Sequence, residues 1–231
     1  MLRKIRSLFG EIGIVPALVY GSDRLLRRLT GGRAQIHLCY FMTQPVPEKA
    51  LLPPGIAKAV TVAPIRAADL RDTELPLSPE LLRSRLERGV VCLGAYKDGR
   101  LIGFHCINFG THDDELYRAR FEPRPAGKAV WDFDIFILPS HRGGLSFAFL
   151  WDGVFDFLRS RDVRWLTSYI AATNVTSLRS HLRMGSVKLG SVVFLRIGAL
   201  QTVFSDRKPY VHVSLADSGR ALFRIDAPET G

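Results

Sequence analysis

Apolar residues near the start of the chain repeat every three or four positions, with basic residues between them. This spacing is typical of an amphipathic helix. The residues that carry it are Leu2, Ile5, Leu8, Phe9 and Ile12. A second helical pattern, of leucines and arginines, covers residues 24–29 and stops at Gly31-Gly32. Apolar stripes of this kind pack more often on the protein itself than on a membrane, but a basic amphipathic helix fits both.

Prolines follow this region and mark a connection. Pro45, Pro47, Pro53 and Pro54 lie within residues 44–56, where their spacing disfavours both a helix and a central strand. The sequence therefore predicts a division near residue 60. Residues 1–59 form a basic, partly helical N-terminal extension, and residues 60–231 form a separate domain.

Downstream, short apolar runs alternate with helical patterns. Strands are predicted at residues 60–65, 90–96, 101–109, 129–138, 165–170 and 187–197, with closing strands at 210–215 and 221–225. Helices are predicted at residues 78–89, 145–161 and 176–184. Asp98-Gly99 is a hairpin turn signal between two of the strands. We therefore expect an α/β domain of the α+β kind, with a mixed central sheet flanked by helices.

The charge of the chain adds a preference for anionic partners. The 231 residues carry 32 Lys and Arg against 22 Asp and Glu, a net charge of +10, and residues 1–66 account for +7 of it, with ten basic and three acidic residues. Anionic lipid, an acidic protein and nucleic acid all fit a basic surface. Nucleic acid fits least well of the three, because the basic residues alternate with Leu and Ile more than with aromatic residues suited to stacking.

Membrane insertion and export are not indicated. The apolar stretch from Ile12 to Tyr20 is about half of the roughly 20 residues that a bilayer-spanning helix needs, and it contains Gly13 and Pro16. The basic start of the chain has no small-residue cleavage pattern after it. We expect a cytoplasmic protein, either soluble or peripheral to the inner membrane face.

The cysteines do not indicate a disulfide scaffold or a zinc site. Cys39, Cys92 and Cys106 are odd in number and contain no CxxC pair. This argues against disulfides and against a zinc site, and favours buried, inert thiols.

The segment from Ile137 to Ser146 joins a predicted strand to a predicted helix through Gly143-Gly144. Amides at a helix N-terminus point outwards, and glycines let a ligand approach them, so such a junction can bind a diphosphate. Many strand-to-helix turns use glycine only for geometry. The segment is therefore a weak signal when taken alone.

A second segment, residues 174–185, follows the next predicted strand. Together the two segments resemble the GCN5-related N-acetyltransferase (GNAT) superfamily, with its cofactor segment V-x-P-x-x-R-G-x-G and its helix N-x-x-A/S-x-x-x-Y-x-x-x-G-F. The matching residues are Ile137, Pro139, Arg142 and Gly143 in the first and Asn174, Ser177 and Gly185 in the second. The resemblance covers roughly residues 60–225.

Three positions depart from the family pattern. Gly144 follows Gly143 directly, where the family has a residue between its glycines, so the loop is one residue short. His181 stands where the family often has tyrosine, and Ser186 replaces the usual aromatic residue after Gly185.

The resemblance implies an N-acyltransferase that uses acetyl-CoA or another acyl-CoA as co-substrate, without a metal. A backbone N–H around Ile137 would stabilise the oxyanion of the tetrahedral intermediate. The residues implied in donor binding are Ile137, Leu138, Arg142, Gly143, Gly144, Leu145, Ser146, Asn174 and Ser177.

Direct attack by an amine needs a base for the ammonium and an acid for the leaving thiolate. His181 is the candidate acid, in place of the family's tyrosine. Asp132 and Asp134 alternate with apolar residues on a predicted strand, so they are expected to share one face, and either is a candidate base. His105 and His112 are alternatives for the base. Each of these residues also fits a purely structural role.

Two other functions remain open. In the first, the enzyme resembles the N-acyl amino acid synthases of this fold, and its donor is an acyl chain on an acyl carrier protein. Carrier proteins are acidic and this chain is basic, so the two would attract each other. A non-catalytic module on the same scaffold, docked to a membrane surface or an acidic partner, is the second. We expect the acceptor to be a small-molecule amine, and no residue pattern identifies it.

Overall fold

The computed structural model describes residues 13–53, 59–70, 74–142, 145–215 and 219–228. The amphipathic helix expected within residues 2–12 therefore lies outside the described residues. The chain divides into two compact units. The first unit comprises Met1–Gln44, Thr111–Pro123 and Thr167–Gly231, and the second comprises Pro45–Gly110 and Arg124–Leu166.

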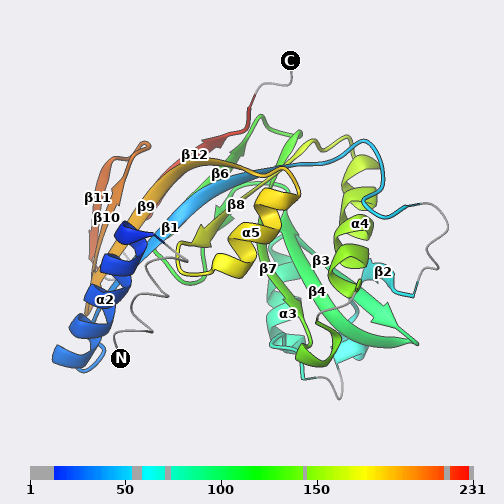
Figure 1. The fold of residues 1–231 in the computed structure, drawn as a ribbon, viewed down its shortest axis with the longest axis horizontal. Coiled ribbons are helices and arrows are strands. Elements are labelled where there is room, and N and C mark those ends of the chain that lie inside the picture. Colours follow the sequence, from blue (N-terminus) through cyan, green and yellow to red (C-terminus); the bar gives the residue numbers. More distant parts are fainter. Residues whose placement is uncertain (1–12, 54–58, 71–73, 143–144, 216–218, 229–231) are drawn as a thin grey trace. The chain divides into compact units, whose positions relative to one another are not determined.

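The first unit contains one end of the large sheet, with strand order β11-β10-β9-β1-β8 (Figure 1). These strands are β1 (Ala34–Pro45), β8 (Trp165–Ala171), β9 (Val187–Ile197), β10 (Leu200–Ser205) and β11 (Val211–Leu215). β1 pairs antiparallel with β9 from Ala34↔Ile197 to Thr43↔Val187. Pro45 and the first two residues of β8 are counted with the second unit.

A small sheet of three strands belongs to the same unit, in the order β12-β6-β5. Its strands are β5 (His112–Asp113), β6 (Ala119–Arg124) and β12 (Ala221–Asp226). Phe121 and Phe223 from this sheet pack against Phe41 of β1, with ring centroids 6.1 and 5.1 Å away. The aromatic core of the first unit therefore lies between the two sheets.

The described residues of the first unit also form the helices α2 (Ile14–Leu29) and α5 (Val175–Arg183). α2 ends where Gly31 and Gly32 adopt φ values of 58° and 83°, which side chains disfavour, so the glycine pair stops the helix as the sequence predicted. The C-terminal end of α5 is tied to β1, because Gln44 donates to the Met184 carbonyl and accepts from the Ser186 hydroxyl.

The second unit contains four strands in the order β7-β4-β3-β2. They are β2 (Thr61–Pro64), β3 (Val90–Lys97), β4 (Arg100–Asn108) and β7 (Ala129–Ile137), and each neighbouring pair is antiparallel. Two short 3₁₀ segments are η1 (Ala67–Leu70) and η2 (Pro139–His141).

Two helices cover the faces of these four strands. α3 (Pro79–Glu87) is capped by Ser78, whose hydroxyl accepts from the Leu81 amide. Its residue Leu82 packs with Phe104 and Cys106 on one face of the strands. α4 (Ser146–Arg159) packs on the other face, where Trp151 contacts His105. The expected fold class, a mixed sheet flanked by helices, is confirmed.

The structure divides the chain differently from the division expected at residue 60. Residues 34–45, assigned to the N-terminal extension, form the strand β1 inside the sheet of the first unit. Cys39, Phe41 and Met42 of this strand are at most 2% exposed. The segment therefore belongs to the core of the first unit, and it pairs with a strand from the C-terminal third of the chain.

The expectation about the cysteines is corrected. Cys92 and Cys106 stand opposite each other on β3 and β4, with Cα atoms 4.2 Å apart, and form a disulfide. Cys39 is free and buried, as expected.

No helix within the described ranges is long and apolar enough to cross a bilayer.

Candidate functional site

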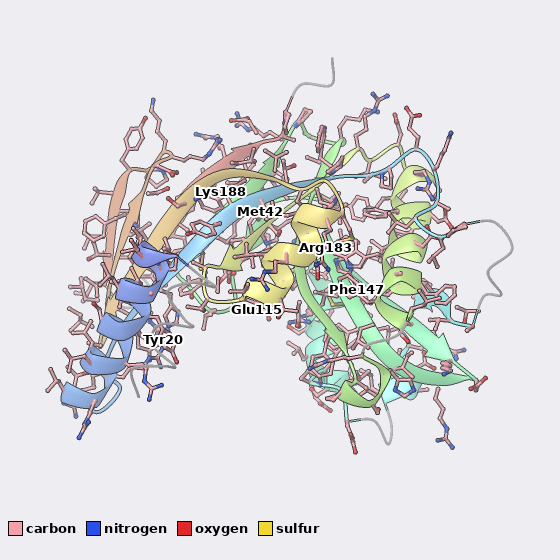
Figure 2. All side chains as sticks on the ribbon, viewed as in Figure 1. Tyr20, Met42, Glu115, Phe147, Arg183 and Lys188 are labelled. Carbon is pink, nitrogen blue, oxygen red and sulfur yellow. A yellow bond between two sulfur atoms is a disulfide. The ribbon has the colours of Figure 1, made fainter. Side chains whose placement is uncertain are left out.

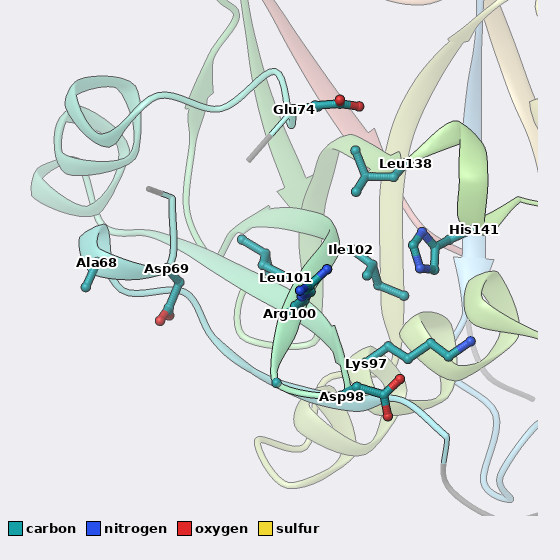
Figure 3. A pocket seen from close by; sticks show the side chains of 11 residues that line it. Ala68, Asp69, Glu74, Lys97, Asp98, Arg100, Leu101, Ile102, Leu138 and His141 are labelled. Carbon is teal, nitrogen blue, oxygen red and sulfur yellow. The ribbon is translucent and has the colours of Figure 1, made fainter. Parts of the chain in front are cut away.

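A pocket of about 1050 Å³ opens beside the turn that follows β7 (Figure 3). It belongs entirely to the second unit, and its walls are the β3–β4 hairpin, the region around η1 and the start of the turn. The lining residues are Ala68, Asp69, Glu74, Lys97, Asp98, Gly99, Arg100, Leu101, Ile102, Leu138 and His141. Leu138 is the residue of this pocket that the sequence had assigned to donor binding.

Acidic and basic side chains line the pocket. Figure 3 shows Lys97 and His141 on one side and Asp69 on the opposite side. Arg66 donates to both carboxylate oxygens of Asp69, and the Tyr96 hydroxyl donates to one of them at 2.7 Å. These bonds lower the pKa of Asp69 to about 2, so its charge is already compensated at neutral pH. Lys97 and Arg100 are both exposed on the hairpin.

The turn itself is anchored by backbone and side-chain bonds. The Leu138 amide donates to the Ile102 carbonyl at 2.9 Å, so β7 stays paired to β4 up to the turn. Because successive amides alternate in direction along a strand, the Ile137 amide points to the other edge of β7. The Arg142 Nε donates to the Ile137 carbonyl at 2.8 Å on that edge.

Arg142 thereby folds back over the strand that precedes it. Its guanidinium carbon lies 5.0 Å from the centroid of the Phe136 ring. The Nε bond and the ring contact hold the guanidinium at the end of β7. Gly143 and Gly144 lie outside the described residues. Leu145 precedes the first residue of α4, Ser146, and makes no side-chain cap bond.

The strand β7 contains a bulge at Asp134. Phe133 stands opposite Cys106 and Ile135 opposite His105, so Asp134 is an extra residue between two paired ones, and its φ is 53°. The expectation that Asp132 and Asp134 share a face is therefore wrong. The bulge turns one carboxylate to each face of the sheet.

Asp134 lies toward α3. Its carboxylate accepts from the Arg85 guanidinium at 2.6 Å, and the Arg85 side chain is only 3% exposed against 34% for Asp134. Arg85 also lies over the Phe133 ring at 5.2 Å and donates to the Cys106 sulfur at 3.4 Å. Asp134 is thus the carboxylate that neutralises a buried arginine.

Asp132 lies toward α4. It bonds the Nε2 of His105, and both side chains are buried, at 6% and 0% exposed. The His105 ring meets the Trp151 ring edge-on, with centroids 4.9 Å apart. His105 was an alternative base to Asp132 in the sequence, and the structure joins the two in one buried pair.

The remaining predicted residues lie in the first unit. Asn174 caps α5, since its side-chain oxygen accepts from the Ser177 amide at 3.2 Å. His181 occupies the last turn of that helix and is 4% exposed. Its carbonyl accepts from the amides of Met184 and Ser186. His112, the other alternative base, is buried on β5.

A second cluster, which the sequence did not predict, connects α2 to β1. Asp23 accepts from the Ile36 amide at 2.9 Å and pairs with Arg27 at 2.7 Å. Arg27 also bonds the His37 Nε2 at 2.7 Å, and the His37 Nδ1 bonds the Tyr117 hydroxyl. A guanidinium only donates, so Nε2 accepts and the proton of the neutral ring sits on Nδ1.

The cluster borders a smaller cavity of about 200 Å³. Burial lowers the pKa of His37 and raises that of Tyr117, and it raises the pKa of the Cys39 thiol to about 12. All three groups are therefore neutral near pH 7. The lining residues are Pro16, Val19, Tyr20, Asp23, Ile36, His37, Leu38, Tyr117, Ala171, Ala172 and Thr173.

No protein-family model and no curated protein matches the sequence. Solved structures do match. One is a functionally unknown conserved protein from Staphylococcus epidermidis, 12% identical over 76% of this chain and 68% of that chain, with a TM-score of 0.47. A putative GNAT-family acetyltransferase from Novosphingobium aromaticivorans is 15% identical over 69% of this chain and 63% of that chain, with a TM-score of 0.45.

A tandem GNAT protein from the clavulanic acid biosynthesis pathway is 16% identical over 74% of this chain and 57% of that chain, with a TM-score of 0.49. The chain thus spans less than two thirds of the length of the last two proteins. Both carry the name of the superfamily that the sequence motifs resemble.

Proposed function

We propose that the protein is an acyltransferase that moves an acyl group from a thioester donor, an acyl-CoA, to the amine of a small acceptor. The observation that carries the proposal is the end of β7, where Arg142 is fixed on the Ile137 carbonyl directly after His141, a residue that lines the pocket of the second unit. The resemblance to the GNAT motifs in the same residues supports it.

Basic side chains around this turn can bind the diphosphate of the donor, in a pocket that Asp69, Glu74 and Asp98 also line. Lys97 and Arg100 on the hairpin and His141 in the turn line the pocket, and Arg142 follows directly in sequence. Arginine and lysine bind phosphate oxygens through charge-assisted hydrogen bonds. The first amides of α4 would add to this binding, because they point out of the helix N-terminus.

The chemistry we propose is direct transfer. The lone pair of the acceptor nitrogen attacks the thioester carbonyl carbon, and the C–S bond breaks as the C–N bond is completed. The nitrogen loses a proton to a base, and the leaving thiolate takes a proton from an acid. We assign the acid to His181 from its place in the GNAT motif alone; it lies in the first unit, whereas Asp134 and the pocket belong to the second. Of the two carboxylates, we favour Asp134 as base, because its side chain is 34% exposed and Asp132 is buried against His105.

Calorimetry with coenzyme A tests donor binding. Arg142→Ala should weaken binding about tenfold or more, the scale of a lost charge-assisted hydrogen bond. Arg83→Ala is the matched control, because Arg83 is also an exposed arginine but lies on α3 and not in the turn that follows β7. Equal affinity in the Arg142 variant would remove this turn from the donor site.

Turnover is tested separately, by thiol release from acetyl-CoA in the presence of a panel of amines. His181→Ala should lower turnover by roughly 10²-fold with little change in donor affinity, and His181→Tyr should retain part of it. Unchanged turnover per folded molecule would end the assignment of His181. Donor binding without turnover on any amine would favour a non-catalytic binding module.

The basic charge of the chain favours one variant of this function. An acyl carrier protein is acidic, and a net charge of +10 would attract it. Binding of an acyl carrier protein without binding of free coenzyme A would identify the carrier-bound donor.

A further inference from the structure

The side of the helix α2 that meets the protein is mixed: Pro16 and Ala17 are buried there, and two charged side chains make specific bonds. Asp23 and Arg27 lie on the side that meets β1, where they bond the Ile36 amide and the side chains of Gln35 and His37. The Asp23 side chain is only 14% exposed. The helix is therefore held to the protein by a polar network together with Pro16 and Ala17, and its row of large apolar side chains is not used for this, although surface helices normally bury such a row.

The opposite side of α2 carries a stripe of large apolar side chains exposed to solvent. Its members are spaced four, seven and four residues apart, which places them on one side of a helix with 3.6 residues per turn. They are Ile14, Leu18, Leu25 and Leu29, with exposures of 68%, 58%, 57% and 72%. We call these four residues the leucine stripe.

The orientation of the leucine stripe is fixed by the bonds on the other side of the helix. Turning α2 to bury the stripe would break the contacts of Asp23 and Arg27 with β1 and leave the Ile36 amide without its acceptor. Each broken contact to a charged group costs about 1.5–3 kcal/mol. An apolar stripe that is held toward solvent in this way indicates a contact surface for another protein or a membrane.

Arginines border the stripe. Arg24 and Arg28 are exposed and lie one position before Leu25 and Leu29. Arg24 also contacts Tyr20, which Figure 2 shows on the same helix, through its ring and its hydroxyl. Residues 13–33 contain four arginines and one acidic residue, Asp23, which is paired with Arg27.

We propose that the leucine stripe of α2 docks on the surface of an anionic lipid bilayer. Leucines would enter the boundary between headgroups and acyl chains while Arg24 and Arg28 remain at the anionic headgroups, which is the arrangement of interfacial helices. A second copy of the chain fits less well. Two stripes in contact would bring Arg24 and Arg28 of each copy together, with Asp23 already engaged on the inner side.

Vesicle co-sedimentation of the full chain tests the proposal, with vesicles of phosphatidylglycerol and phosphatidylcholine compared with phosphatidylcholine alone. We expect binding to the anionic vesicles, weakened by salt. Leu25→Glu should weaken it at least about tenfold, the scale of a buried leucine. Arg24→Gln and Arg28→Gln should each weaken it about fivefold, and only on anionic vesicles.

Val213→Glu is the matched control. Val213 lies on β11 in the same unit and is 59% exposed, close to the value for Leu25, so it introduces the same charge into an equally exposed apolar side chain. It should bind vesicles as the unmodified protein does. Both variants should keep the melting temperature of the unmodified protein, because both side chains are exposed.

Three results would overturn the proposal. They are absence of binding to anionic vesicles, equal loss of binding in the Val213 control, and a dimer in solution that Leu25→Glu dissociates while vesicle binding is absent. None of these measurements uses a thioester or an amine, so their outcome is independent of the proposed acyl transfer.

Discussion

At the scale of single residues, the structure depends on a buried arginine that Asp134 neutralises. The Arg85 side chain is 3% exposed, and such a charge is tolerated only when it is paired and hydrogen-bonded. Asp134 meets this need from a backbone conformation with φ of 53°, in the left-handed region that Asp, Asn and Gly enter most readily. Position 134 is therefore constrained twice, by charge and by conformation.

These two constraints can be separated by substitution. Asp134→Asn keeps a residue that tolerates the left-handed region but removes the charge, and it should lower the free energy of unfolding by about 3–5 kcal/mol, the scale of a broken buried pair. Double substitution of Asp134→Asn with Arg85→Met removes both charges and should recover most of the loss. Denaturant unfolding measures both.

If Asp134→Asn were as stable as the unmodified protein, the ion pair with Arg85 would carry no weight in the fold. If it were stable and inactive, Asp134 would act in turnover alone. The double variant distinguishes lost charge from altered packing.

At the scale of secondary structure, the motif residue Asn174 has a structural role that its match to the GNAT pattern did not reveal. Its side chain accepts from the Ser177 amide at the start of α5. Asn174→Ala should lower the free energy of unfolding by about 1 kcal/mol, and Asn174→Asp or Asn174→Ser should preserve it. Thermal melts of the three variants check this.

Donor affinity measured on the same preparations separates capping from binding. With capping as its whole role, Asn174→Ala lowers the melting temperature and leaves the affinity for coenzyme A unchanged. A loss of affinity in the stable Asn174→Asp variant would assign the side chain to the donor site as well.

The contact between α2 and β1 predicts a dependence of stability on pH. Burial holds the pKa of His37 below its ordinary value, so the folded state keeps the ring neutral where the unfolded chain protonates it. Below about pH 6.5 the unfolded state therefore binds more protons, and stability falls as the pH falls. At higher pH the ring is neutral in both states and this effect vanishes.

His37→Gln supplies a side chain without this titration. As the pH is lowered from about 7 to about 5, the melting temperature of the unmodified protein should fall more than that of the variant. Parallel curves across that range would show that His37 does not contribute to the pH dependence.

Most elements could be predicted because their patterns are local. The helix α3 has its cap and proline, and the β3–β4 hairpin has Asp98-Gly99, with φ values of 49° and 75°. β1 gave no such signal. Cys39, Phe41, Met42, Thr43 and Gln44 are all buried, so a strand covered on both faces shows no alternation.

Features that depend on a shift in the register of strand pairing could not be predicted from the sequence. A two-residue turn at Asp98-Gly99 places Cys92 opposite His105, but a shift between Ala95 and Tyr96 moves the pairing by one residue, to Cys106. The bulge at Asp134 separates the two carboxylates in the same way. Nothing in the local sequence marks either shift, so the disulfide and the arginine pair were missed.

At the scale of the whole molecule, neither compact unit is a continuous stretch of chain. The chain passes between them at residues 44/45, 110/111, 123/124 and 166/167. The first unit combines N-terminal and C-terminal parts of the chain, because β1 pairs with β9 through ten pairs of residues, from Ala34↔Ile197 to Thr43↔Val187. The division at residue 60 would remove a strand from the interior of a sheet.

A truncation tests this directly. A chain that starts at residue 60 lacks β1, including Phe41 and Met42, which are 0% and 2% exposed. Loss of each such side chain costs about 2–5 kcal/mol, and the lost strand also leaves the β9 edge unpaired, so the sum approaches a total stability of about 5–15 kcal/mol. We expect residues 60–231 to aggregate or to lack a cooperative thermal transition.

The matched control removes residues 1–12 alone, which leaves all described residues in place, and should melt cooperatively. A soluble, cooperatively folding 60–231 fragment would show instead that the remaining strands form a domain without β1.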